Sequence, residues 1–172
     1  MPLPLGGSWE GAIFMRIVIQ RANGASVVID GHVNAEFQGL GYVILLGIEA
    51  TDTQEDVEWL VRKVAALRVF DDENGVMNRS ILDIQGEHEG QDGNIIVVSQ
   101  FTLFASYKKG NRPSWLRAAT HDISVPLYNA FVQQLSAAIG RLVGHGEFGA
   151  DMKVSLCNDG PVTIIMDTKN KE

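Results

Sequence analysis

Residues 16–48 indicate the fold most clearly, with the sequence RIVIQRANGASVVIDGHVNAEFQGLGYVILLGI. It is rich in β-branched residues, and Asn23-Gly24 and Asp30-Gly31 interrupt it with dipeptides that are typical of turns between strands. The final run, residues 41–48, is continuously apolar and is typical of a buried strand. The segment therefore predicts short strands joined by turns, at residues 16–20, 25–30, 33–37 and 41–48.

Two amphipathic helices are expected beyond this segment. Residues 52–55 have the pattern of a capping box, and apolar residues then recur at helical spacing to Leu67. Ser124 and Pro126 predict the start of the second helix, and Gly144 with Gly146 its end. Strands around two helices predict a mixed α/β fold in which two β-sheets carry helices on one face. The further strands are expected at residues 94–103, 152–156 and 162–166.

Length and composition favour one domain. The chain has 172 residues, of which 45% are hydrophobic, and residues 15–172 are expected to form a single domain with a full core. Residues 1–14, rich in Gly and Pro, are interpreted as a flexible extension or as an over-extended start before Met15. They lack the basic start of a secretory peptide, and no apolar run is long enough to span a bilayer, so a cytoplasmic protein without a membrane partner is expected.

The charge and the absent motifs exclude several classes of function. A formal net charge of −7 argues against a broad phosphate-binding surface for DNA, although a protein that grips one end of an RNA needs only a local basic patch. The four histidines show no ligand spacing with one another or with Cys157, and neither a Gly-rich phosphate loop nor a nucleophile elbow is present. A structural zinc site is therefore not expected.

Ser99-Gln100-Phe101-Thr102-Leu103 places three polar side chains at the end of an apolar strand. One interpretation is a strand that leaves the core, so that alternate residues meet water. The other is a pocket lined by hydroxyls, an amide and backbone N–H groups, which can stabilise an oxyanion. A hydroxyl without an adjacent base is a poor nucleophile.

Residues 158–163, Asn-Asp-Gly-Pro-Val-Thr, place a proline inside a strand-like region, which indicates a turn or a bulge. The alternative is a rigid backbone wedge built on Gly160 and Pro161, with a cis bond between them.

A third local feature is the basic loop of residues 108–115. Lys108, Lys109, Arg112 and nearby Arg117 form the densest basic cluster of this acidic chain. The loop is either solvated or binds RNA, with Tyr107 and Trp115 available to stack on a base.

Taken together, these segments closely resemble the D-aminoacyl-tRNA deacylase family, from Met15 to about Asp167. Residues 99–103 and 158–163 are similar to its two signature motifs. The opening at residues 15–27, the turn at residues 71–78 and the loop at residues 109–114 fit as well. Each motif alone is weak or moderate, whereas all of them in the right order are specific.

The resemblance implies a three-layer sandwich of two β-sheets with helices on one side, in a homodimer with its sites at the subunit interface. Ser99, Gln100, Phe101 and Thr102 would form the catalytic pocket, in which the N–H groups near Phe101 and Thr102 hold the ester carbonyl. Gly160 and Pro161 would enter the other subunit's pocket as a cis dipeptide and reject L-amino acids. Arg21, Val162 and Thr163 would support that dipeptide, and Lys108, Lys109 and Arg112 would contact the tRNA.

The implied reaction is hydrolysis of the ester of a D-aminoacyl-tRNA, or of a mischarged glycyl-tRNA, at the acceptor end. The ribose 2′-OH of the tRNA would assist, so no side chain needs to attack. The resemblance implies no metal and no organic cofactor. Two other functions remain open: a module that binds the tRNA end without turnover, and a general esterase that uses Ser99 or Thr102.

Overall fold

The computed structural model describes residues 15–172, so the expected extension at residues 1–14 lies outside the described residues. In chain order the elements are β1 (Arg16–Ile29), β2 (His32–Gly47), α1 (Gln54–Ala66), β3 (Arg68–Asp71), β4 (Met77–Ser80), α2 (Glu87–Gly90), β5 (Asn94–Ser99), the 3-10 turn η1 (Phe101–Phe104), α3 (His121–Ile139), β6 (Gly144–His145) and β7 (Met152–Asp167).

The first two strands are longer than the sequence predicted. Asp30 and Gly31 form the predicted two-residue turn, with φ angles of 50° and 76°, and Ile29 pairs with His32 across it. Asn23-Gly24 was wrongly expected to be a turn. Gly24 takes a positive φ of 80°, and the register with β7 shifts between Ala22 and Ala25, so the dipeptide forms a bulge inside β1.

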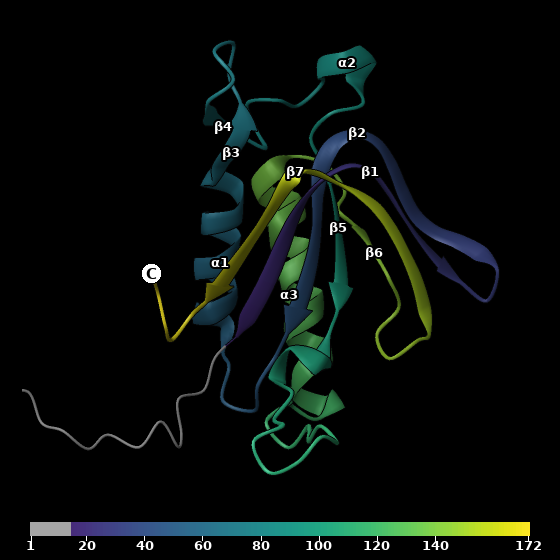
Figure 1. Cartoon of the computed structure of the whole chain (residues 1–172), viewed down its shortest axis with the longest axis vertical. Coiled ribbons are helices and arrows are strands. Elements are labelled where there is room, and N and C mark those ends of the chain that lie inside the picture. The colour runs from purple at the N-terminus through teal and green to yellow at the C-terminus, as the bar shows by residue number, and fades with distance from the viewer. Residues whose placement is uncertain (1–14) are drawn as a thin grey trace, which may run out of the picture.

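A five-stranded sheet in the order β6-β5-β2-β1-β7 forms the centre of the molecule. β5 pairs in parallel with β2 and β6, and the other pairs are antiparallel. The helices α1 and α3 lie together on one face, and the long strands β1, β2 and β7 arch away from them (Figure 1). The mixed α/β fold with helices on one side is therefore confirmed. The second sheet is only the ribbon β3–β4.

Alternation along the central strands produces two cores. Ile44 and Val97 face the helices and belong to the larger core, whereas Val43 and Ile96 face the opposite side. The smaller core lies under the arched ends of β1, β2 and β7, which pack partly buried apolar side chains against it. Bending of one continuous sheet, rather than a separate second sheet, thus provides the layer opposite the helices.

The predicted helices exist, but their ends differ. Thr53 is the N-cap of α1, and its N–H donates to the carboxylate of Asp56 (2.8 Å), so the predicted capping box was one residue early. α3 begins at His121 after Thr120, with Pro126 inside it, and ends at Gly140 because that residue takes a left-handed φ of 71°. Among the residues that the structure describes, no helix combines the length and hydropathy needed to cross a membrane.

Candidate active site

The strand predicted at residues 94–103 is shorter than expected, and the difference creates the candidate site. β5 ends at Ser99, which pairs with Leu46 of β2, and the Gln100 N–H then donates to the Leu46 carbonyl (2.8 Å). The chain tightens into η1 directly against β2. Gly47 permits this approach, because a Cβ at that position would lie 2.8 Å from the Phe104 ring and 3.2 Å from the Gln100 carbonyl oxygen.

The η1 turn leaves two backbone donors without an acceptor inside it. Its first hydrogen bond runs from the Leu103 N–H to the Gln100 carbonyl (3.3 Å). The N–H groups of Phe101 and Thr102 come before this bond and are the orphan donors with which any helical turn begins. Donors of this kind suit an oxygen that gains negative charge.

A cavity of about 600 Å³ adjoins the turn. Ser99, Gln100 and Phe101 form part of its wall, whereas Thr102 is not among the lining residues. The Oγ of Thr102 accepts a hydrogen bond from the Gln100 side-chain amide, which is not a base. The structure therefore brings the first three residues of the motif into the cavity and gives the Thr102 hydroxyl no activating partner there.

Aromatic side chains from distant segments complete the cavity. Trp115 contacts Phe101 edge to face, with 5.3 Å between ring centroids, and His121 contacts Phe148 in the same way at 5.2 Å. Sequence reasoning singled out neither Phe148 nor His121. Neither position shows a local pattern, and only the fold brings the start of α3 next to the loop before β7.

The second motif forms an exposed bulge in β7. β7 runs continuously through residues 158–163, and its register with β1 shifts there, so the predicted bulge is confirmed. The Gly160–Pro161 bond is cis and both residues are exposed. Asn158 spans the bulge: its Oδ1 accepts the Val162 N–H (3.2 Å), and its Nδ2 donates to the Thr163 Oγ1 (3.2 Å).

Arg21 clamps this bulge from β1. Only 7% of Arg21 is exposed; its Nε donates to the Asp159 carbonyl (3.0 Å), and its Nη2 lies 3.2 Å from the Asp159 carboxylate. Its Nη1 donates to the Val69 carbonyl of β3 (2.6 Å) and lies 3.2 Å from the Asp71 carboxylate. Gly160 takes a positive φ of 127°, and a Cβ there would lie 2.9 Å from the Val162 side chain and 3.1 Å from Nη2, so the bulge favours glycine at that position.

One chain does not bring the two motifs together. Ser99 pairs with Leu46, which pairs with Ile17 of β1, whereas the bulge lies between the partners of Gln20 and Ala22. The bulge is thus about four residues from Ser99 along the strand direction, roughly 13 Å, and three strands away across the sheet, roughly 14 Å.

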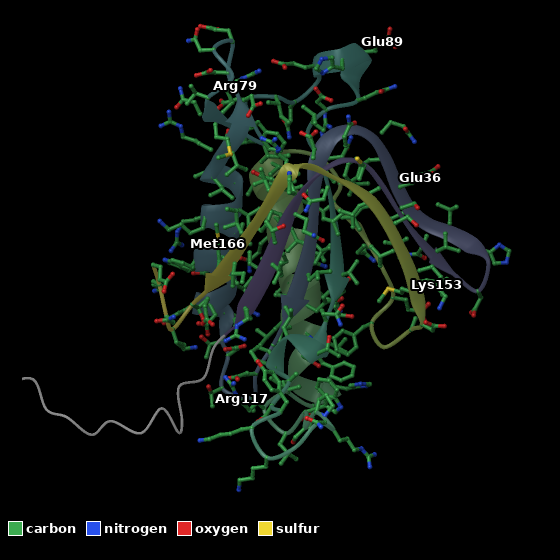
Figure 2. The ribbon with its side chains drawn as sticks, viewed as in Figure 1. Glu36, Arg79, Glu89, Arg117, Lys153 and Met166 are labelled. Atoms are coloured by element: carbon green, nitrogen blue, oxygen red, sulfur yellow. The ribbon has the colours of Figure 1, made fainter. Side chains whose placement is uncertain are left out.

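The basic loop lies at the end of the molecule that holds the cavity. Ser106 and Ser114 close it through two backbone hydrogen bonds of 2.9 and 2.7 Å, and Lys108, Lys109 and Arg112 are exposed between them. Figure 2 shows Arg117 at this lower end, with Arg79 at the opposite end. Within residues 15–172, no group of three or more His, Cys, Asp or Glu side chains is arranged to hold a metal ion.

Comparison with known proteins gives consistent matches. Residues 18–167 match the family model described as D-Tyr-tRNA(Tyr) deacylase. The D-aminoacyl-tRNA deacylase of Phocaeicola vulgatus is 61% identical over 158 residues, covering 92% of this chain and 100% of that protein. The one of Chromobacterium violaceum is 54% identical with the same coverage.

Two solved structures are similar as well. One, titled c-Myc DNA Unwinding Element Binding Protein, is 40% identical, with a TM-score of 0.78 over 88% of this chain and 97% of that one. The other, a probable eukaryotic D-amino acid tRNA deacylase, is 15% identical, with a TM-score of 0.74 over 90% of this chain and 100% of that one. At that identity it shows the shared fold alone.

Proposed function

The chain belongs to the D-Tyr-tRNA(Tyr) deacylase family, and from this membership we propose that it hydrolyses the ester of D-aminoacyl-tRNA and of mischarged glycyl-tRNA. It acts in the cytoplasm as a homodimer and releases the free amino acid and the tRNA. The observation that carries the proposal is the cavity walled by Ser99, Gln100 and Phe101, beside two orphan backbone donors.

The donors of η1 supply the chemistry that the protein itself contributes. The N–H groups of Phe101 and Thr102 hold the ester carbonyl oxygen and stabilise its charge when water adds to the carbonyl carbon. The neighbouring 2′-OH of the terminal ribose assists the proton transfers. Collapse of the tetrahedral intermediate then breaks the bond to the ribose oxygen, which leaves as a hydroxyl. Support comes from Thr102, whose Oγ is engaged by an amide rather than by a base.

Selectivity for the D configuration comes from the bulge of the partner. The carbonyls of its Gly160-Pro161 face the Cα of the bound amino acid, where an L side chain collides with the backbone and a D side chain points away. Glycine has no side chain and also passes. The exposed, clamped bulge supports this role, as does its separation from the cavity of its own chain.

The cavity and the loop fit the acceptor end of a tRNA. About 600 Å³ accommodates an aminoacyl group together with a terminal nucleoside, and aromatic rings on its wall offer stacking surfaces. Lys108, Lys109 and Arg112 are exposed, and in this proposal they contact the phosphates of the acceptor strand. This local patch supplies positive charge on a chain whose formal net charge is −7.

The test is deacylation of matched D-Tyr-tRNA and L-Tyr-tRNA by the purified protein. Fast release from the D form, with the L form spared, is the expected result. Equal release from both substrates would indicate an unselective esterase. Tight binding of the tRNA without release from either substrate would indicate a binding module, and both of these outcomes contradict the proposal.

A further inference from the structure

Arg117, two residues after the basic loop, contacts the η1 turn while 43% of its side chain remains exposed. Its Nη2 lies 2.8 Å from the Oε1 of Glu49, which is only 2% exposed. Its guanidinium also lies over the ring of Phe104, 5.7 Å from the centroid. Phe104 is fully buried and is the last residue of η1. The guanidinium is therefore held between a buried carboxylate and the base of the turn.

A second arginine contacts the same ring. Arg16 lies over Phe104 at 5.5 Å, donates to the Leu103 carbonyl (2.9 Å) and pairs with Asp167 (3.0 Å). The two arginines and their carboxylates fix the end of η1 relative to β1 and to the end of β2. Its first two residues carry the orphan N–H groups, so the position of these donors depends on the arrangement.

The loop and the turn are joined at two points. Trp115 packs on Phe101 at the start of η1, and Arg117 packs on Phe104 at its end. Ala118 forms a bridge with Glu49, and the Ala119 N–H donates to the Ile48 carbonyl (2.9 Å), which fixes the loop to the end of β2. A shift of the loop is therefore transmitted to the turn.

We propose that Arg117 is a positioning residue for deacylation, which sets the η1 donors through Glu49 and Phe104 and couples them to the basic loop. This inference rests on the proposed function. Small displacements of donors lower the rate of the chemical step strongly, whereas a phosphate contact acts on binding. Arg117, which pairs with a buried carboxylate, differs in this respect from Lys109 of the basic loop, for which we propose a tRNA contact.

The test compares Arg117→Gln with Arg117→Lys, Glu49→Gln and a matched control. Arg62→Gln removes an exposed arginine from α1, away from the loop, and is the control. Each variant is checked by circular dichroism, and kcat, KM and the salt dependence of KM are measured with D-Tyr-tRNA. We expect Arg117→Gln to lower kcat by about tenfold or more with KM within about twofold of the parent.

The other variants separate positioning from folding and from RNA contact. Arg117→Lys keeps the charge opposite Glu49 but lacks the planar group that lies on Phe104. This variant should therefore fold like the parent and have a kcat between those of Arg117→Gln and the parent. Glu49→Gln should lower kcat as well, and the double variant should lose no more than the worse single variant, because both act through one contact. Lys109→Ala should instead raise KM and reduce the salt slope by about one.

Two results would overturn the inference. One is a raised KM and a smaller salt slope for Arg117→Gln at unchanged kcat, which is the behaviour of a phosphate contact. The other is parental kinetics for both Arg117→Gln and Glu49→Gln. A parent protein that releases nothing from D-Tyr-tRNA would defeat the proposed function and this inference together. An active parent with unaffected variants would defeat this inference alone.

Discussion

At the scale of single residues, the proposed chemistry depends on backbone groups that particular side chains keep in place. Gly47 permits η1 to lie against β2, Arg21 and Asn158 hold the exposed bulge, and Arg117 supports the end of the turn. The hydroxyl of Thr102, by contrast, accepts a hydrogen bond from the Gln100 side-chain amide, which is not a base and cannot activate it. Removing a side chain should therefore have different effects at these positions.

Thr102→Ala should keep substantial deacylase activity. The substitution removes an Oγ that accepts from Gln100 and leaves the backbone N–H in place. We expect the single-turnover rate on D-Tyr-tRNA to stay within about tenfold of the parent. Total loss of activity, with the circular dichroism spectrum unchanged, would instead make Thr102 the nucleophile.

Pro161→Ala should loosen the discrimination between D and L substrates. The pyrrolidine ring fixes φ in the exposed bulge, and alanine releases it while Arg21 still holds Asp159. We expect the rate on L-Tyr-tRNA to rise relative to the rate on D-Tyr-tRNA, measured as the ratio of the two. An unchanged ratio would show that the bulge does not reject L-amino acids.

At the scale of elements, buried charge ties the start of α1 to the end of the chain. Asp52 accepts the Glu49 N–H (2.7 Å) and lies 3.5 Å from Lys169, which also contacts Asp56 at 2.9 Å. Burial raises the pKa of Asp52 to about 6, although the Glu49 N–H and Lys169 oppose the shift. For Asp56, burial raises the pKa, but hydrogen bonds from Lys169 and Thr168 outweigh it, so its pKa is lowered.

The raised pKa predicts how Asp52 affects stability. Between pH about 4 and about 6 the folded state holds the proton that the unfolded state has lost, so Asp52 makes the free energy of unfolding fall as pH rises. Asp52→Asn removes this dependence. The unfolding free energy of the variant minus that of the parent should rise across this window by roughly 1–3 kcal/mol and level off above it. Urea denaturation at several pH values measures the difference, and a pH-independent difference would contradict the assignment.

The sequence predicts the types of the elements better than their ends. Alternation and helical spacing identified the long strands and the two long helices, because the apolar pattern follows burial. They did not identify the short strands β3, β4 and β6. Asn23-Gly24 has the residues of a turn, but pairing of β1 with both β2 and β7 keeps the strand continuous and turns the dipeptide into a bulge. Gly140 ends α3 before the predicted glycines because it is the first to take a left-handed φ.

In the candidate site, too, the sequence predicts some residues and not others. Residues 99–102 and 158–163 are contiguous and carry recognisable motifs, so their sequence identifies them. His121, Phe148, Glu49 and the position of Arg117 depend on contacts between segments that are distant along the chain. No local pattern encodes such contacts, and only the folded arrangement reveals them.

At the scale of the whole molecule, the proposed site requires two copies of the chain. β7 is an edge of the five-stranded sheet, and among the described residues no strand pairs with its outer side. It carries Ile165, 68% exposed, and the exposed Gly160-Pro161 bulge. Long free edges with apolar side chains are typical of surfaces that pair with another chain. We expect a dimer by light scattering at micromolar concentration, and a monomer would remove the shared site.

We propose that each site combines the cavity of one copy with the bulge of the other. A mixed dimer tests it most directly, with Ala150→Trp in one protomer to fill its cavity and Pro161→Ala in the partner. Two different affinity tags select this dimer from the homodimers. The only open cavity then belongs to the Pro161→Ala protomer, and across the interface it meets an unaltered bulge. We predict release from D-Tyr-tRNA with the selectivity of the parent; the loosened selectivity of the Pro161→Ala homodimer would show that each chain uses its own bulge and would contradict the account.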